Sequence, residues 1–249
     1  MNNTLITAHL NLYAVLPALK ESSGTKNGIG LSVLPIGFII PEISHKPISL
    51  VHILEGRDNE ENIRLVLAFE NADCFNLFMD GRGLPFSVVE GWYRIDLLIR
   101  FLIMMLRMKK LLRPSPHLLS NASFKHRHVQ ALLMLGLRAS RELATLEPKS
   151  QWALHTGAQG MVEFCIEGAD ICAWCTVSRI SLEHGSGHAP GVANVIITFK
   201  DVDAILTLLR NEIDFLSATG LTWIKVRGFV PLADTIGFVM DRVHRYLTP

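Results

Sequence analysis

The sequence predicts an α+β protein made of two related halves. Short segments rich in branched and aromatic residues, bounded by Pro, Gly and Asn, alternate with longer segments whose apolar residues recur at helical spacing. The order of these segments occurs twice in 249 residues, a length that suits two domains of ordinary size. Between the two runs lies "RPSPHLLSNASFKH", which has the Pro, Ser and Asn content of a connecting segment.

Composition favours a protein with a large apolar interior. Hydrophobic residues make up 49% of the chain and charged residues 19%, and the formal net charge of +1 gives no field that would attract nucleic acid or an acidic partner. The mean hydropathy is +0.29. The most apolar run, residues 95–108, is interrupted by Arg100 and Arg107 and is shorter than the roughly 20 residues that a membrane span needs. We therefore expect the apolar excess to form an enlarged core, a ligand cavity or a buried interface.

The beginning of the sequence predicts a cytoplasmic location. "MNNTLITAHLNLYAV" has neither a basic stretch nor a small-residue cleavage site, so we expect no secretory signal. In that compartment the four cysteines should be reduced thiols.

Each predicted element of the first half has a local cause. Leucines at helical spacing predict a helix over residues 4–21, interrupted at Pro17, and branched residues predict strands within 29–40, 47–56 and 62–70. Asn71 is a candidate N-cap for a helix over 71–79. A strand over 86–91 and a helix over 93–112 follow, and Lys and Arg at the end of that helix suit its dipole.

The second half shows the same order. A helix over 129–146 precedes strands within 160–168, 171–185 and 194–199, a helix over 202–209, a strand over 221–228 and a helix over 231–247, where Pro231 lies in the first turn. The sequence thus predicts domains over residues 1–113 and 126–249, joined by a linker over 114–125.

The repetition can be followed position by position. Phe69 and Phe199 are 130 positions apart (199 − 69), and Gly91 and Gly228 are 137 apart (228 − 91). The first offset also pairs Asp73 with Asp203, and the second, continued into the last helix, pairs Ile99 with Ile236 and Phe101 with Phe238. Any two α+β segments share some apolar periodicity, but an ordered match through strand, helix, strand and helix favours tandem domains.

The second copy resembles a known family. "ANVIITFKDVDAILTLLRNEIDFLSATGLTWIKVRGFVPLADTIGFVMDRVHRYL" is similar to the C-terminal half of the sterol carrier protein 2 (SCP2) domain: a strand ending at Phe199, an acidic helix start at Asp201, a turn over 211–214 and a glycine-bounded strand from Gly220 to Gly228. With the preceding helix and hairpin, the resemblance covers residues 129–247. Asn211 stands where the family usually has Gly, a mild departure for a left-handed cap. The first copy lacks this turn and resembles a degenerate copy.

The resemblance implies a non-catalytic fold: a mainly antiparallel sheet with helices on one face, enclosing an apolar tunnel. It implies a hydrophobic lipid partner (fatty acyl, sterol-like or isoprenoid) and no cofactor. The candidate lining residues are apolar positions of the second copy, namely Ile205, Leu208, Leu209, Phe215, Leu221, Trp223, Ile236, Val239 and Met240. The same residues would equally serve as an ordinary packed core.

Other chemistry is less well supported by the sequence. "CAWC" has redox spacing, but it lies in a strand pattern that would direct Cys172 and Cys175 to opposite faces. Cys165, His184 and His188 lie near it in sequence without completing a usual zinc pattern, so we expect no metal site. The chain contains no G-x-S-x-G, Walker A or H-E-x-x-H motif, and we expect no enzymatic activity.

The sequence leaves two questions open. The first concerns a group of cations that flank an apolar helix: Arg100, Arg107, Lys109, Lys110 and Arg113. They indicate either a solvated helix end or peripheral contact with anionic lipid headgroups.

The second question is whether the protein binds a lipid at all. The alternative is an interaction or scaffold module with filled cores, or an accessory protein in lipid or quinone metabolism. In that case the apolar excess lies between the copies or in a homodimer interface.

Overall fold

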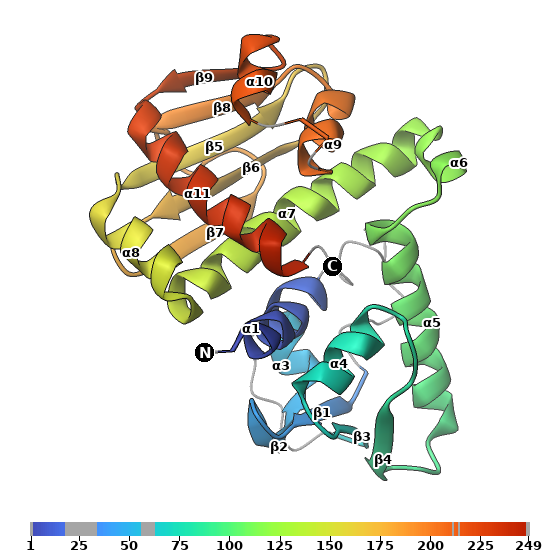
Figure 1. Cartoon of the computed structure of the whole chain (residues 1–249). Coiled ribbons are helices and arrows are strands. Elements are labelled where there is room, and N and C mark those ends of the chain that lie inside the picture. The colour runs from blue at the N-terminus through green and yellow to red at the C-terminus, as the bar shows by residue number, and fades with distance from the viewer. Residues whose placement is uncertain (1, 18–33, 56–62, 211, 214, 248–249) are drawn as a thin grey trace. The chain divides into compact units, whose positions relative to one another are not determined.

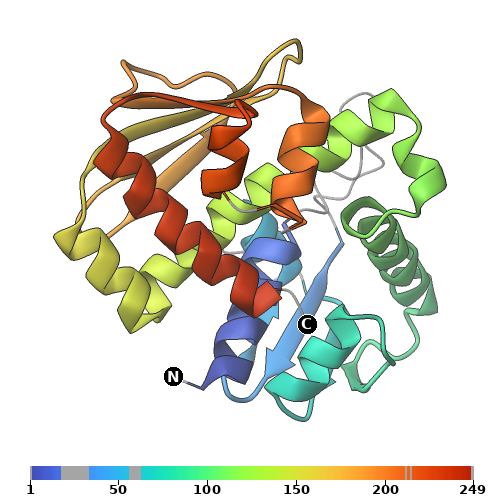
Figure 2. The ribbon, with the colours of Figure 1, turned by 45° about the horizontal axis from the view of Figure 1, so that its top comes forward.

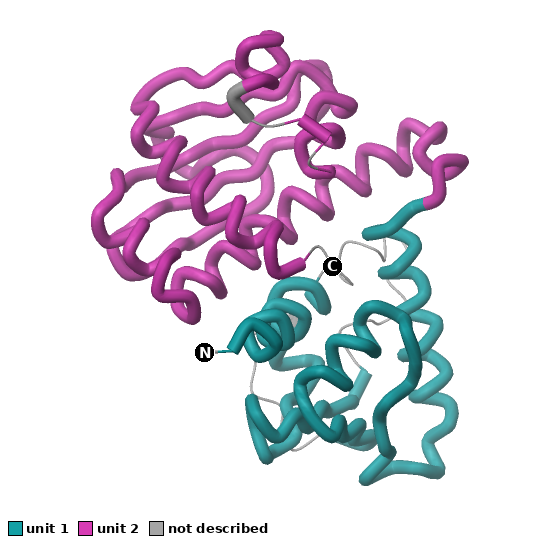
Figure 3. Tube along the Cα trace, viewed as in Figure 1, with its two compact units in different colours: residues 1–114 teal, residues 115–249 magenta. Residues whose placement is uncertain are grey.

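The computed structural model describes residues 2–17, 34–55, 63–210, 212–213 and 215–247. It divides into two compact units, Met1–Pro114 (unit 1) and Ser115–Pro249 (unit 2), shown in Figures 1 and 3. The described residues of each unit form helices and one sheet, which confirms the predicted α+β class. None of the described helices is long and apolar enough to cross a membrane.

Unit 1 contains a four-stranded sheet in the order β2-β1-β3-β4. Its central strands β1 and β3 are parallel, and the two outer pairings are antiparallel. In chain order the elements are α1 (Asn3–Leu10), the π-helix η1 (Asn11–Val15), β1 (Ile36–Ile40), β2 (Ser44–Ser49), α3 (Leu50–Glu55), β3 (Leu65–Phe69), α4 (Ala72–Met79), β4 (Phe86–Glu90) and α5 (Ile95–Leu112).

Unit 2 contains a five-stranded sheet in the order β7-β6-β5-β8-β9. Here β5 and β8 are parallel, and the other pairings are antiparallel. Its elements are α6 (Pro116–Leu119), α7 (Ala122–Leu146), α8 (Pro148–Thr156), β5 (Gly160–Ile166), β6 (Cys172–Val177), β7 (Leu182–Ser186), β8 (Val195–Phe199), α9 (Val202–Leu209), α10 (Phe215–Gly220), β9 (Ile224–Gly228) and α11 (Val230–Leu247).

The two sheets share one topology. In unit 1 the order β2-β1-β3-β4 corresponds to β6-β5-β8-β9 in unit 2, with the parallel pair at the centre of both and β7 as an addition. In each unit a short helical segment joins the last two strands and an 18-residue helix follows them. This correspondence fits the predicted tandem arrangement.

The start of the short helix is built in the same way in both units. The side chain of Asn71 accepts a hydrogen bond from the backbone N–H of Cys74 at 2.8 Å, and that of Asp201 accepts one from Ala204 at 2.7 Å. Each satisfies a backbone donor that the first helical turn leaves without a partner. The prediction of Asn71 as an N-cap is confirmed, and its counterpart lies at the predicted offset of 130 (201 − 71).

The repeated glycine also has a common structural cause. Gly91 directly follows the edge strand β4 and has a φ angle of +75°. Gly228 is the last residue of the edge strand β9 and has a φ angle of +108°. A Cβ atom would lie 2.0 Å from the carbonyl oxygen of Arg64 in the first case and 2.3 Å from that of Asn194 in the second. Only glycine combines this backbone conformation with so close an approach of the neighbouring strand.

The predicted pairing of the last helices is wrong by two residues. Ile99 is exposed whereas Ile236 is buried, and Phe101 is buried whereas Phe238 is exposed. The buried residues instead match at an offset of 135 (232 − 97): Leu97 with Leu232, Phe101 with Ile236, Met104 with Val239 and Met108 with Val243. The reason is that α5 begins four residues after Gly91, but α11 begins two residues after Gly228.

Several element boundaries differ from the sequence prediction. Residues 47–56 were expected to form a strand, but only the end of β2 lies there, and α3 occupies residues 50–55. The helix expected from residue 129 begins at Ala122, and the segment expected to be a linker, 114–125, contains α6 and the first residues of α7. Helices α8 and α10 had no counterpart in the prediction. Further predictions fall partly outside the described residues: positions 18–21 of the expected first helix, positions 29–33 of the expected first strand, and Asn211 and Asp214 of the expected turn.

Candidate functional site

The core of unit 2 lies between its sheet and the helices on one face of that sheet (Figure 2). In β5, the alternate residues Val162, Phe164 and Ile166 are buried, so this face of the strand is directed into the core. Helix α7 contributes Val129, Leu133 and Leu137 to the same cluster, and α11 contributes Leu232, Ile236 and Val239.

The residues predicted to line a tunnel fall into three groups. Ile205, Ile236 and Val239 are fully buried members of the core cluster. Leu208, Leu209, Trp223 and Met240 are only partly buried and pack against that cluster from its margin. Leu221 is 54% exposed and is not part of the cluster, and the side chain of Phe215 lies outside the described residues.

Together with Val226, which is also partly buried against the core cluster, these four residues form what we call the apolar margin of unit 2: Leu208, Leu209, Trp223, Val226 and Met240. These residues come from α9, from β9 and the residue before it, and from α11. A methyl group in place of the Gly136 hydrogen would lie 3.2 Å from the Met240 Cε atom, so the end of this flexible side chain rests on the bare backbone of α7. Through these residues the core of unit 2 continues to the surface.

A second apolar feature, which was not expected from the sequence, lies between α8 and α11. A hollow of about 340 Å³ is lined by Pro148, Lys149, Trp152 and Phe238, and the two aromatic side chains are exposed. The sequence could have indicated this hollow only through one exposed aromatic residue on each of the two helices. Because α8 was not predicted, the hollow was missed.

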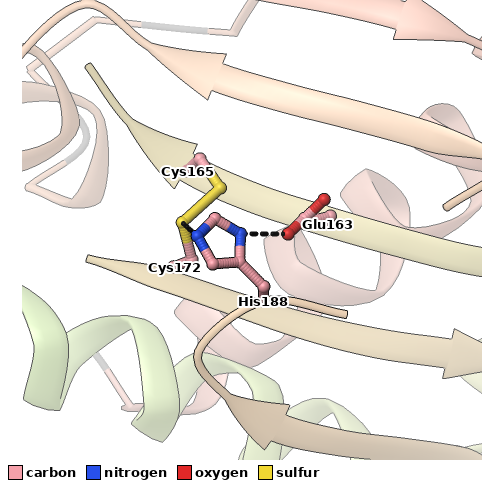
Figure 4. Close-up of side chains that lie close together, drawn as sticks. All are labelled: Glu163, Cys165, Cys172 and His188. Atoms are coloured by element: carbon pink, nitrogen blue, oxygen red, sulfur yellow. Dashed lines mark hydrogen bonds and ion pairs between the residues drawn. A yellow bond between two sulfur atoms is a disulfide. The ribbon is translucent and has the colours of Figure 1, made fainter. Parts of the chain in front are cut away.

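A polar cluster occupies the opposite face of the sheet of unit 2 (Figure 4). Cys165 in β5 and Cys172 in β6 are paired in the sheet and joined by a disulfide. The expectation of four reduced thiols is therefore wrong for these two, whereas Cys74 and Cys175 are free. Cys175 is directed into the core, and burial raises the pKa of its thiol to about 12. The prediction that Cys172 and Cys175 face opposite sides of the strand is confirmed.

His188 and Glu163 complete this cluster. His188 Nδ1 lies 2.8 Å from Glu163 Oε1, and its Nε2 lies 3.9 Å from Cys172 Sγ. The backbone N–H of Ala189 donates to the same Glu163 oxygen at 3.2 Å. The structure thus brings together Cys165 and His188, two of the three residues considered for zinc, and adds Glu163, which sequence reasoning missed.

The third of those residues, His184, lies elsewhere. It pairs with Cys175 in the sheet, on the strand next to α7. Burial and, to a smaller extent, the nearby cations Arg141 and Arg138 together lower the pKa of His184 to about 4. This imidazole is therefore neutral at neutral pH, and its Nδ1 has no hydrogen-bond partner among the residues that the structure describes.

Comparison with known proteins identifies similar structures but no similar sequence. No protein-family model matches the chain, and no curated protein matches it. A Thermus thermophilus protein described as a candidate sterol carrier protein is 11% identical, with a TM-score of 0.37 over 46% of this chain and 87% of that one. The protein described as "UbiJ-SCP2 Ubiquinone synthesis protein" is 14% identical, with a TM-score of 0.34 over 50% of this chain and 94% of that one.

An enzyme also occurs among the similar structures. The sec-alkylsulfatase Pisa1 from Pseudomonas sp. is 12% identical, with a TM-score of 0.31 over 68% of this chain and 30% of that one. Each of these likenesses is one of fold. The chain is similar in fold to SCP2-domain structures.

Proposed function

We propose that unit 2 binds a hydrophobic lipid, of fatty acyl, sterol-like or isoprenoid type, and presents or transfers it without catalysing a reaction. The observation that carries this proposal is the apolar margin, where five apolar side chains are continuous with the buried core yet remain partly exposed. A core that ends at the surface in this way offers a ligand an apolar surface to cover.

The driving force would be burial of apolar area. Each Å² removed from water contributes about 25 cal/mol, so covering about 200 Å² contributes about 5 kcal/mol before the cost of ordering the ligand. Met240 suits this role because its unbranched side chain adapts to ligands of different shape.

The predicted lining residues take different parts in this proposal. Ile205, Ile236 and Val239 form a closed base, since they are already buried. Leu208, Leu209, Trp223 and Met240 would contact the ligand, with Leu221 at the rim. Phe215 stays a prediction from the sequence.

The first test is native mass spectrometry of the full chain before and after organic extraction. We expect a co-purifying lipid that extraction removes, and a return of mass when the extracted protein is given acyl chains, sterols or isoprenoids. A bare protein that also stays bare with all three ligand types would refute the proposal.

Substitutions then locate the ligand. Met240→Gln and Leu209→Asn place polar groups of similar size in the apolar margin and should weaken binding of a fluorescent acyl chain. Val192→Thr is the matched control, because Val192 is 95% exposed and is not part of the core cluster. Equal binding by all three variants would place the ligand away from the apolar margin.

A second candidate function rests on a different observation in unit 1. Helix α5 buries Leu97, Phe101 and Met104, yet on its other side Ile95, Ile99, Ile103 and Leu106 are exposed at positions i, i+4, i+8 and i+11. We call these four residues the α5 stripe. Trp92 and Tyr93, both exposed, come just before the helix.

The charges around the α5 stripe favour an anionic membrane surface as its partner. Arg100, Arg107 and Lys110 are exposed on the same helix, while the nearby carboxylate of Asp96 is paired with Arg94 at 3.0 Å. An amphipathic helix with aromatic residues and cations beside its apolar face has the composition of one that lies in a membrane interface. Such contact would suit a protein that takes up or releases a lipid.

Vesicle sedimentation tests this second candidate. We expect the full chain to sediment with vesicles of phosphatidylcholine and phosphatidylglycerol and not with phosphatidylcholine alone, and Ile99→Asp to abolish the effect while Val192→Asp does not. Light scattering on the same variants measures their oligomeric state and so tests the alternative, in which the α5 stripe is a dimer interface. A dimer that Ile99→Asp dissociates, with no vesicle binding, would refute membrane contact and favour the interaction-module alternative.

A further inference from the structure

The Cys165–Cys172 disulfide lies beside groups that a purely structural crosslink does not need. It joins directly paired residues of β5 and β6 on the face of the sheet away from the core. The two sulfurs, one ring nitrogen of His188 and one carboxylate oxygen of Glu163 all lie within 4.8 Å of one another (Figure 4). Thiolate, imidazole and carboxylate are the three ligand types that bind Zn²⁺ in proteins.

The backbone after β7 places His188 at this point. Gly187, the residue that follows β7, has a φ angle of +83°, and its N–H donates to the carbonyl oxygen of Cys172 at 2.8 Å. The chain therefore turns back across β6 directly before His188. The His188 side chain is 75% exposed, so an ion can reach it from solvent.

Glu163 determines which nitrogen of His188 is directed at the sulfurs. Its Oε1 atom lies 2.8 Å from Nδ1 and also accepts the Ala189 N–H, so the carboxylate is held on that side of the ring. With Nδ1 protonated and donating to Glu163, Nε2 presents its lone pair toward Cys172 Sγ, 3.9 Å away. A carboxylate behind the histidine is the usual arrangement around a metal-binding imidazole.

We propose that the cluster is a redox-controlled zinc site, in which reduced Cys165 and Cys172 together with His188 Nε2 bind one Zn²⁺ and Glu163 orients the histidine. Water takes the fourth position of the tetrahedral ion. In the disulfide form the two sulfurs are bonded to each other and do not serve as thiolate ligands, so the site exists only after reduction.

The chemistry balances through thiol–disulfide exchange. Two thiols of a reductant, from the small-thiol or dithiol-protein class, supply two electrons and two protons. The Cys165–Cys172 bond breaks, two thiols form and the reductant becomes a disulfide. Zn²⁺ then displaces the two thiol protons and binds both thiolates. In reverse, a disulfide of the same class accepts two electrons from the two thiolates, so its own S–S bond breaks and it leaves as two thiolates, which take up protons from water. The bond between Cys165 and Cys172 forms again, and Zn²⁺ is released.

The direct test compares zinc binding by the oxidised and the reduced full chain. The chain is reduced with a phosphine, freed of reductant without air and titrated with Zn²⁺ in competition with a chromogenic chelator, while native mass spectra count the ions. We expect one ion on the reduced chain and none on the oxidised chain. Cobalt binding to the reduced chain should give thiolate charge-transfer absorption, a readout that needs no substitution.

Variants assign the ligands. Glu163→Gln should weaken zinc binding by about 10- to 100-fold, as loss of an outer partner does. Cys165→Ser, Cys172→Ser and His188→Ala should each weaken it by more than that range, while circular dichroism confirms that they fold. Cys74→Ser and His155→Ala are the controls, since Cys74 is a free thiol of unit 1 and His155 is exposed on α8.

Three results would overturn the proposal. They are a reduced chain that binds no zinc, an oxidised chain that binds it equally well, and an unchanged affinity in Cys165→Ser. Selective alkylation of Cys172 at a rate that depends on His188, with no zinc bound, would instead indicate a nucleophilic thiol. None of these results depends on lipid binding by unit 2.

Discussion

Arg242 on α11 donates hydrogen bonds from Nε, at 2.8 Å, and from Nη2 to one carboxylate oxygen of Glu147, the residue that joins α7 to α8. Tyr246 donates to the same oxygen at 2.9 Å, and Ser150 donates to the other at 2.6 Å. Burial of Glu147 opposes its ionisation, but the hydrogen bonds from Arg242, Ser150 and Tyr246 outweigh it, and the pKa of Glu147 is lowered. A buried, paired charge therefore fixes the last helix to the α7–α8 corner.

Removing one partner of this pair should destabilise the protein. In Arg242→Met the carboxylate of Glu147, a residue only 3% exposed, keeps its charge without the guanidinium, and we expect a loss of about 3 kcal/mol in the free energy of unfolding. Urea denaturation measures it. Arg245→Met is the control, because the Arg245–Asp241 pair is exposed and should contribute less than about 1 kcal/mol. Equal losses in both variants would contradict the importance of the buried pair.

His184 should make stability depend on pH. Its pKa is about 4 in the folded protein and near 6.5 when unfolded, because partial burial disfavours the charged imidazole and the cations Arg141 and Arg138 repel it. Between these values the unfolded chain binds more protons, so the free energy of unfolding falls as pH decreases from about 6.5 to about 4 and is independent of this group above that window. Thermal denaturation of the wild type and His184→Gln across the window tests this. The variant should show a shallower decrease, and parallel curves would refute the assignment.

Gly228 should be intolerant of alanine. The new Cβ would lie 2.3 Å from the Asn194 carbonyl oxygen at a φ of +108°, so the neighbouring strand must shift. We expect Gly228→Ala to cost more than about 3 kcal/mol, the upper end for backbone strain alone. Gly168→Ala separates the two effects, because Gly168 has a φ of +72° but a Cβ added there would meet no atom within 4 Å, and it should cost only about 1 kcal/mol. Similar losses in the two variants would show that the close approach is unimportant.

The sequence predicted an element correctly where the interactions that form it lie within the element itself. The bounds of α9, residues 202–209, were predicted correctly because a capping aspartate and helical periodicity act within the segment itself. The apolar run at 47–56 satisfies strand and helix equally, and contacts with the rest of unit 1 decide that α3 forms there. Apolar periodicity alone likewise did not show the two-residue difference before α5 and α11.

The polar cluster was missed for a related reason. Cys165 and Cys172 meet because β5 and β6 pair in one particular register, and His188 joins them because the chain turns at Gly187. A one-residue change of register would separate the sulfurs onto opposite faces. The apolar margin could not be predicted from the sequence for a different reason. Residues that line a ligand site and residues that fill a core have the same kinds of side chain, so only the structure shows which of them are partly exposed.

The N-cap of α9 connects stability to the proposed ligand site. The Asp201 carboxylate accepts the Ala204 N–H at 2.7 Å at the start of the helix that carries Leu208 and Leu209. Asp201→Ala removes this bond and should lower the free energy of unfolding by about 1 kcal/mol, whereas Asp201→Asn keeps an acceptor and should restore most of it. Urea denaturation gives the stability, and the fluorescent acyl chain gives the affinity. Because fraying of α9 would displace part of the apolar margin, we expect Asp201→Ala also to weaken acyl-chain binding and Asp201→Asn not to. Weaker binding in both variants, with stability retained in Asp201→Asn, would mean that the carboxylate charge and not the helix start matters to the ligand.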